Sequence, residues 1–319
     1  MFPMHRPAGK VRASSPHAEK TVVSKPAAPW RIKGKRVYRS FSQRELDTEY
    51  DVEAAVGADE HQACRAAAMA DSIRVRDARG ATTDVPYGPT EGQRLDVFAA
   101  PAPAAPVAVY IHGGYWKSGS KESCLLFAET FAGAAYVSVE YDRVPDVPVA
   151  EIVRQCRAAV AWVHEHAAEF NGDPANIHVL GHSVGGQLTA MVAATDWRGE
   201  YGIAADPVRS IAVTSGVYDL EPVRLSFANV WARLDRAAAT AASPIFNLPA
   251  RPRPAVVGWG ADETAEFRRQ SQDFAVALQA RGWPCRTFAV EGRHHFDVAR
   301  TLADAAHPMT RAVLDNMGL

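Results

Sequence analysis

The sequence predicts an α/β fold, in which a mostly parallel central sheet carries helices on both faces. Its 319 residues, 47% of them hydrophobic and 22% charged, are enough to bury a sizeable core. Short apolar runs typical of buried strands alternate with longer stretches of helical periodicity, and this alternation favours a parallel sheet. The predicted strands are 106–111, 134–141, 177–180, 210–214, 255–258 and 285–290.

The spacing of apolar residues predicts the helices between these strands. The clearest helix spans 149–170, where apolar residues recur every three to four positions and so form one stripe. Similar patterns predict helices over 185–194 and 266–280, and Arg281 followed by Gly282 is a plausible end for the second. These helices therefore serve as the connections that a parallel sheet requires.

Two further segments precede this alternation of strands and helices. Residues 42–70 are expected to form one or two helices, with Ser42 as the N-cap and Glu45 three residues later. Residues 87–98 resemble one or two antiparallel edge strands.

A helical stretch also interrupts the strand rhythm late in the chain. Residues 220–248 carry the aromatic side chains of Phe227 and Trp231. We expect this stretch to be a cap-like insertion that covers part of a functional site, although its aromatic residues could equally belong to the core.

The N-terminal segment differs in composition from the rest. Residues 1–36 contain nine basic residues and one acidic residue, show no periodicity, and are rich in Pro, Ser and Ala. We predict a disordered tail over residues 1–40 and a single domain over 41–319. A transit peptide and a tail that touches nucleic acid or a membrane surface remain alternatives. The acidic balance of the remaining chain argues against nucleic-acid binding as its main task.

Several classes of protein are excluded by composition and motif. No run of 18 apolar residues is present, so we expect no transmembrane helix and no membrane partner. No HExxH, P-loop or GxGxxG motif occurs, so we expect neither a metal nor another cofactor. The oligomeric state stays open, with a homodimer among the alternatives. A reducing, cytoplasmic location is expected because the cysteines lack the spacing of zinc sites or disulfide scaffolds; they are Cys64, Cys124, Cys156 and Cys285.

The strongest chemical signal is the sequence GHSVG at 181–185, which directly follows a predicted strand and begins a predicted helix. A sharp strand-to-helix turn of this kind tolerates only small residues two before and two after its central serine, and it exposes the serine hydroxyl above the sheet. Ser183 is therefore the predicted nucleophile. The alternative is a glycine-rich helix start used only for close packing.

A second signal is HGGYW at 112–116, at the end of the predicted strand 106–111. Backbone N–H groups of a Gly-Gly turn can approach a developing oxyanion without obstruction by a Cβ atom. We predict an oxyanion hole formed by Gly113 and Gly114 together with the N–H group of Val184. His112 is expected to pack beneath the turn rather than act as the base.

The acid and the base are expected on loops that follow the last two predicted strands. Asp262 and its neighbour Glu263 follow 255–258, and His294 and His295 follow 285–290. The order Ser, Asp, His along the chain, with each group beyond the carboxyl end of a strand, matches the α/β-hydrolase plan. Asp262 would orient the histidine.

Alternatives to these assignments remain from spacing alone. Glu263 is a rival acid, and Asp219, which follows the preceding strand, is another. Spacing does not separate His294 from His295.

The chain resembles kynurenine formamidase (arylformamidase) within the α/β-hydrolase superfamily. The resemblance runs from about Arg44 to the C-terminus and rests on the motifs HGGYW, GHSVGGQL, GADETAEFRRQSQDF and HHFD. It implies a triad of Ser183, Asp262 and His295, because the matching histidine is the one before Phe296. Val184 stands where alanine is expected, and its extra methyl groups are expected to narrow the acyl site.

The resemblance also implies the substrate, which nothing in the residues themselves reveals. It implies hydrolysis of an aryl formamide such as N-formyl-L-kynurenine, with Tyr115, Trp116 and Phe296 shaping an aromatic pocket. The partner would be a small aromatic amide or ester. A general carboxylesterase or aryl-acylamidase with the same triad is the first alternative. A non-catalytic binding protein is the second, and the intact Ser, Asp and His argue against it.

Overall fold

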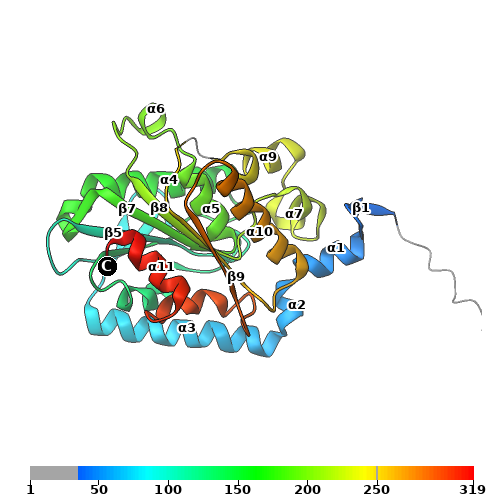
Figure 1. Cartoon of the computed structure of the whole chain (residues 1–319), viewed down its shortest axis with the longest axis horizontal. Helices are drawn as coiled ribbons and strands as arrows, with labels where there is room; N and C mark the ends of the chain where they lie inside the picture. The colour runs from blue at the N-terminus through cyan, green and yellow to red at the C-terminus, as the bar shows by residue number, and fades with distance from the viewer. Residues whose placement is uncertain (1–34, 249–250) are drawn as a thin grey trace, which may run out of the picture. The chain divides into compact units, whose positions relative to one another are not determined.

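The computed structural model describes residues 35–248 and 251–319 (Figure 1). Its centre is an eight-stranded sheet with the order β10-β9-β8-β7-β5-β6-β4-β3. The six strands from β10 to β6 are parallel, whereas at one edge β4 pairs antiparallel with both β6 and β3. The strands are β3 (Thr82–Pro86), β4 (Arg94–Phe98), β5 (Ala105–Ile111), β6 (Ala135–Val139), β7 (Gly172–His182), β8 (Val208–Thr214), β9 (Ala255–Gly260) and β10 (Cys285–Val290).

All six predicted parallel strands are confirmed, and the bounds of 285–290 agree with β10. The strand predicted over 177–180 is longer, because β7 begins at Gly172, ahead of the buried apolar run that marks a strand in the sequence. The antiparallel edge is also confirmed. Its first strand, β3, ends before Tyr87, however, and residues 87–93 form the connection to β4.

Two apolar layers cover the two faces of the sheet. Successive side chains of a strand point to opposite faces, so Val107 and Val109 of β5 join one layer while Ala108 and Tyr110 join the other. The first layer includes α4 (Val149–His166), α5 (Val184–Ala193) and α10 (Ala265–Ala280); the second includes η1 (Lys121–Glu129), η4 (Val298–Ala303) and α11 (Pro308–Met317). Figure 1 shows α4 and α5 on one side of the sheet and α11 with α3 (Ala58–Arg79) on the other.

The predicted helices form where their apolar stripes can be buried. In α4 the stripe is fully inside, with Ile152, Cys156 and Val160 each at 0% exposure. A short 3-10 turn, η2 (Ala167–Phe170), completes the segment predicted as one helix. Helix α10 ends at Ala280, with Arg281 as its C-cap, and Gly282 follows at φ +79°, a left-handed conformation that glycine adopts without strain.

The N-terminal part of the described chain contains more helix than predicted. Ser42 is the N-cap of α1 (Gln43–Tyr50) and forms a reciprocal capping box with Glu45, as the sequence predicts. Helix α2 (Val52–Val56) and the long α3 follow, so the region holds three helices and extends past residue 70.

The predicted disordered tail falls mostly outside the described residues, which begin at residue 35. The prediction of disorder is wrong for the last residues of this tail. There β1 (Arg36–Tyr38) pairs with β2 (Phe41–Ser42) as a two-stranded antiparallel ribbon. Backbone pairing of this kind requires an ordered chain from Arg36 onward.

The interval 220–248 contains only short helical elements that lie near the carboxyl ends of the strands. They are α7 (Glu221–Leu225), α8 (Asn229–Ala232), α9 (Arg236–Ala241) and η3 (Pro244–Phe246). A further short helix, α6 (Trp197–Tyr201), connects α5 to β8. Among the helices of the described residues, none is both long and apolar enough to span a membrane.

Candidate active site

Ser183 occupies the sharp turn between β7, which ends at His182, and α5, which begins at Val184. Its backbone lies at φ 56° and ψ −127°, a conformation that residues with side chains rarely adopt. Its N–H group donates to the carbonyl of Thr214 on β8, at 2.9 Å. This bond ties the strained turn to the sheet and directs the hydroxyl beyond its edge.

The two glycines of the GHSVG motif allow this turn because other backbone groups approach them closely. A Cβ atom on Gly181 would collide with the carbonyl oxygen of Gly185, and one on Gly185 would collide with that of Ile111 on β5. The small residues that the motif predicts are therefore required by contact with backbone, which cannot move aside as a flexible side chain can.

His295 completes a continuous hydrogen-bonded chain with Ser183 and Glu263. Its Nε2 lies 3.0 Å from Ser183 Oγ, and its Nδ1 lies 3.2 Å from Glu263 Oε1. The side chains of His295 and Glu263 are 4% and 0% exposed. Phe267 of α10 packs edge-on against the imidazole, with ring centroids 4.5 Å apart. The prediction of Ser183 and His295 as a pair is thus supported by their geometry.

The predicted acid was misplaced by one residue. Asp262 is exposed, and its backbone N–H donates to the carbonyl of Arg293 instead. Ala261 and Glu263 also donate backbone hydrogen bonds, to Val290 and Gly260, so the chain turns tightly after β9. Because of this turn the two adjacent carboxylates lie in opposite environments, and it is the longer Glu263 that reaches the imidazole.

The other two candidates for the triad, Asp219 and His294, form contacts away from Ser183. Asp219 accepts a hydrogen bond from Tyr38 at 3.1 Å and from the backbone of Glu221 at 3.0 Å. His294 forms polar contacts with Glu60 and Asp297 rather than with Ser183.

His112 lies beneath the Gly-Gly turn, as expected. Its Nε2 lies 2.9 Å from Glu140 Oε1, and its Nδ1 lies 2.7 Å from the carbonyl oxygen of Gly113. Its ring stacks on Tyr141 at 4.3 Å. Burial raises the pKa of Glu140, but the hydrogen bond and charge of His112 and the charge of Arg143 outweigh it, so this pKa falls to about 2. The carboxylate therefore holds His112 in a fixed orientation.

A second histidine, His182, lies directly beside the predicted base. Its ring centroid is 4.8 Å from that of His295, and its Nδ1 lies 3.1 Å from Thr214 Oγ1. Burial, followed by the charge of His295, holds the pKa of His182 well below its usual range. His182 stays neutral at ordinary pH, so it does not compete with His295 for the role of imidazolium.

The residues of the predicted oxyanion hole surround the hydroxyl. Gly113 lies so close to Ser183 that an added Cβ would be 3.0 Å from the serine Cβ. Gly114 has φ +115°, and its carbonyl accepts the N–H groups of Lys117 and Ser118, so the turn is held in place. Val184 is the first residue of α5, where a backbone N–H has no acceptor within the helix. This arrangement supports the predicted donors.

A cavity of about 470 Å³ opens at Ser183 and His295. Its aromatic lining comes from separate segments of the chain and includes Tyr50, Tyr115, Phe227, Trp231 and Phe296. Trp231 meets Tyr115 and Phe227 edge-on, with centroids 5.9 and 5.5 Å apart. The segment 220–248 therefore contributes a wall of the cavity, which supports its predicted covering role.

Two pocket expectations need correction. Trp116 is 0% exposed, does not line the cavity, and donates its indole N–H to Gln187 at 3.1 Å. Tyr115 and Trp116 both have positive φ, so the chain turns between them and only Tyr115 faces the cavity. The side chain of Val184 also points into the core rather than the cavity, so it does not narrow the acyl site.

Several other residues that line the cavity carry no signal in the sequence, including Tyr50, His61, Arg65 and Lys117. They come from α1, α3 and the turn after β5 and show no motif spacing. Lys117 was detectable only as the neighbour of HGGYW. Its ammonium lies 3.5 Å from the ring centroid of Trp231, a contact that depends on the folded insertion.

Comparison with known proteins places this geometry in a family. Residues 95–213 match the BD-FAE family model. The chain is 30% identical to the kynurenine formamidase of Salmo salar over 77% of this chain and 85% of that protein. The chain belongs to the kynurenine formamidase family. The protein of that name from Danio rerio is 28% identical over 88% of this chain and 98% of its own length.

A solved structure shares the α/β-hydrolase fold. A Silicibacter protein provisionally assigned as a thioesterase has a TM-score of 0.73 and 26% identity, covering 84% of this chain and 98% of its own. Together these relatives establish the chain as a hydrolase of the α/β-hydrolase fold.

The family motif around 266–271 has a structural role here. Gln270 Oε1 accepts the backbone N–H groups of Tyr218 and Asp219, and its Nε2 donates to Asp219 O and Tyr50 Oη. Tyr50 also donates to Glu266. Gln270 therefore fixes the entry to the insertion 220–248 against α1 and α10.

Proposed function

We propose that this chain hydrolyses an aryl formamide, N-formyl-L-kynurenine, to L-kynurenine and formate by a serine mechanism. The observation that carries the proposal is the buried chain from Glu263 through His295 to Ser183, which ends at an aromatic-lined cavity. A planar aromatic substrate fits such walls, because aromatic rings favour stacked and edge-on contacts.

In the first half-reaction His295 Nε2 removes the proton of Ser183 Oγ as this oxygen attacks the formyl carbon. The negative charge that develops on the formyl oxygen accepts hydrogen bonds from the backbone N–H groups of the oxyanion hole. Protonated His295, stabilised by Glu263, then gives its proton to the departing aryl amine. Amide cleavage needs this step because an amine anion is a poor leaving group.

In the second half-reaction water attacks the formyl ester on Ser183. His295 takes a proton from that water and returns it to Ser183 Oγ as formate leaves. Every proton movement passes through one imidazole nitrogen, so no cofactor is required by this scheme.

Two of the cations that line the cavity support a substrate with a carboxylate. Among the residues that the structure describes, Arg143 and Arg300 pair with Glu140 and Asp71, whereas Lys117 and Arg65 form no ion pair. A free amino-acid carboxylate could pair with either of these two cations. This feature favours N-formyl-L-kynurenine over an uncharged aryl formamide.

The test uses purified protein and a substrate panel of N-formyl-L-kynurenine, N-formylaniline, N-acyl anthranilates and short p-nitrophenyl esters. We expect the highest kcat/KM for N-formyl-L-kynurenine. We also expect Ser183→Ala to fold but to lose kcat on the order of 10⁶-fold, as nucleophile removal does in serine hydrolases. Normal turnover by a folded Ser183→Ala protein would exclude the serine mechanism.

A general carboxylesterase or aryl-acylamidase with the same three residues is the second candidate. The likeness to the Silicibacter protein favours it, because that protein is provisionally assigned to thioester rather than amide cleavage. Turnover of p-nitrophenyl esters without turnover of either formamide would select this candidate. Failure of an organophosphate to label Ser183 would instead support a non-catalytic protein.

We also propose a reducing, cytoplasmic location. All four cysteines are unpaired in the structure, and two of them, Cys124 and Cys156, are buried. Thiols that remain free are characteristic of reducing compartments. Localisation of the tagged full-length chain tests this proposal, and recovery in an oxidising compartment would contradict it.

A further inference from the structure

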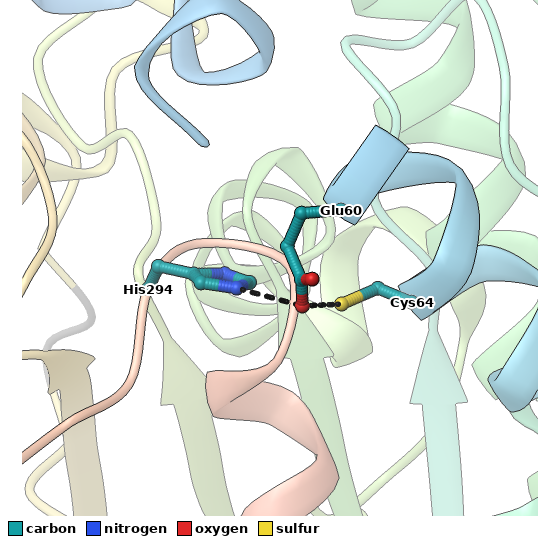
Figure 2. Close-up of side chains that lie close together, drawn as sticks. All are labelled: Glu60, Cys64 and His294. Atoms are coloured by element: carbon teal, nitrogen blue, oxygen red, sulfur yellow. Dashed lines mark hydrogen bonds and ion pairs between the residues drawn. The ribbon is translucent and has the colours of Figure 1, made fainter. Parts of the chain in front are cut away.

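A second group of chemically reactive side chains lies beside the catalytic loop and plays no part in the proposed mechanism. Glu60 and Cys64 are one turn apart on α3, and His294 comes from the loop after β10. Figure 2 shows the three side chains converging on one point from these two segments. Their potential ligand atoms all lie within 4.8 Å of one another.

Two of the three ligand separations match those around a tetrahedral metal ion. Glu60 Oε1 lies 3.4 Å from Cys64 Sγ and 3.6 Å from His294 Nε2. Zinc binds sulfur, nitrogen and oxygen ligands at about 2.0–2.3 Å, so two ligands of one tetrahedral ion lie about 3.3–3.8 Å apart. The two observed separations fall within this range without movement of the backbone.

An independent contact orients the histidine for this role. Its other ring nitrogen, Nδ1, accepts the backbone N–H of Phe296 at 3.2 Å and lies 3.3 Å from Asp297 Oδ1. Asp297 is itself held by the backbone N–H of His294 at 2.8 Å and by Arg293 at 2.9 Å. These contacts hold the ring of His294 with its Nε2 towards Glu60.

We propose that Glu60, Cys64 and His294 bind a divalent transition-metal ion of the zinc class. One thiolate, one imidazole and one carboxylate suit zinc better than the hard cations Mg²⁺ or Ca²⁺, which prefer oxygen ligands alone. Binding forms a metal–sulfur bond and releases the thiol proton of Cys64 to solvent. Glu60 is exposed, so a water molecule can complete the fourth position.

The position of this site gives it a structural consequence. Cys64 lines the same cavity as Ser183, and His294 is the direct neighbour of His295. A bound ion would join the start of α3 to the loop that carries the catalytic imidazole. The sequence could not indicate the site, because His294 lies near the C-terminal end of the domain, far along the chain from Glu60 and Cys64.

Cobalt(II) provides a direct test with the full-length protein after removal of metals by a chelator and gel filtration. We expect one Co²⁺ per chain, strong visible absorption typical of four-coordinate cobalt, and a near-ultraviolet thiolate-to-cobalt charge-transfer band. Addition of one equivalent of Zn²⁺ should abolish both absorptions. A titration without the charge-transfer band would overturn the proposal.

Variants assign the ligands. Cys64→Ser should abolish the charge-transfer band, whereas Cys285→Ser, which changes a partly buried cysteine on β10, should keep it. Far-ultraviolet circular dichroism establishes that each variant is folded. A band that persists in folded Cys64→Ser would contradict the assignment.

Discussion

At the scale of single residues, the backbone at Ser183 holds a conformation that costs about 1–3 kcal/mol for a residue with a side chain. The cost is sustained because the turn is fixed at both ends, by the bond from Ser183 N to Thr214 O and by the close packing of Gly185 on Ile111. The strain places Oγ within 3.0 Å of His295. Reactivity at this site therefore depends on contacts that no single side chain provides.

Glu263 and Asp262 offer a matched pair of substitutions one residue apart. Glu263→Gln should lower kcat on the order of 10³–10⁴-fold, because a neutral amide cannot stabilise the imidazolium and favours the wrong tautomer of His295. Asp262→Asn, at an exposed side chain, should leave kcat close to that of the unmodified protein. Steady-state kinetics with the substrate turned over fastest provide the measurement. A larger loss in Asp262→Asn would return the role to Asp262.

Substitution of Lys117 tests whether the protein binds the carboxylate of the substrate. Lys117→Met keeps much of the aliphatic length that packs on Trp231 but removes the charge. We expect KM for N-formyl-L-kynurenine to rise about 10-fold, the value of a charge-assisted hydrogen bond of about 1.4 kcal/mol, with little change in kcat. Parallel kinetics on N-formylaniline, which lacks the carboxylate, serve as the control. An equal rise in KM for both substrates would rule out carboxylate pairing.

At the scale of elements, the site forms because the loops that follow β5, β7, β9 and β10 leave the parallel strands at the same edge of the sheet. The last two of these loops are packed directly together. A Cβ on Gly260 at the end of β9 would collide with the carbonyl of Arg293, two residues before His295. The separation between Glu263 and His295 is therefore set by backbone contact rather than by the two side chains.

The close contact between β5 and α5 at Gly185 gives a prediction about stability. In Gly185→Ala the new methyl group would meet the carbonyl oxygens of Ile111 and His112, so we expect a loss of about 3 kcal/mol in the free energy of unfolding and of most activity. Gly186→Ala is the matched control, since its methyl would first meet Gly216 Cα at 3.3 Å, and we expect a change within about 1 kcal/mol. Urea denaturation measures both variants. Equal stability of the two would show that the contact at Gly185 relaxes easily.

At the scale of the whole molecule, the two apolar layers enclose polar groups that respond to pH. His178 on β7 is 2% exposed, with Nδ1 2.7 Å from Ser210 Oγ and Nε2 2.9 Å from Asn176 Oδ1. Burial, assisted by the charge of Arg209, lowers its pKa from 6.5 to about 4. The folded state therefore holds this histidine neutral at pH values where the unfolded chain would protonate it.

The sign of the effect on stability follows from proton binding. Below pH 6.5 the unfolded state binds the proton more readily, so stability contributed by His178 is complete above this pH and is lost as the pH falls towards 4. The loss amounts to at most about 3 kcal/mol, from about 1.4 kcal/mol for each pH unit. His182, with its lowered pKa, acts in the same direction.

Urea denaturation between pH 6.5 and 4 tests whether His178 causes this loss of stability. His178→Gln retains hydrogen-bonding capacity but cannot titrate, so its free energy of unfolding should fall less steeply between pH 6.5 and 4. His164→Gln, at a more exposed histidine of α4, should keep the steep dependence. Identical slopes in the three proteins would locate the pH dependence in other groups.

The sequence by itself determined the six parallel strands and the nucleophile turn, because each depends on local chemistry, whereas local spacing left His294 and His295 as alternatives for the base. Apolar β-branched runs mark buried strands, and GHSVG encodes a turn that small residues alone permit. Ser42 and Glu45 formed their capping box for the same reason, since both partners lie within one helical turn.

Only the tertiary structure decided which neighbour of a correctly located residue faces the site. Asp262 and Glu263, and likewise Tyr115 and Trp116, are adjacent in turns, where side-chain direction depends on backbone angles and not on a period of 2 or 3.6. The sequence likewise could not predict the contact of Lys117 with Trp231 or the convergence of Glu60, Cys64 and His294. These contacts join segments far apart in the chain, so they exist only after the sheet and its loops have assembled.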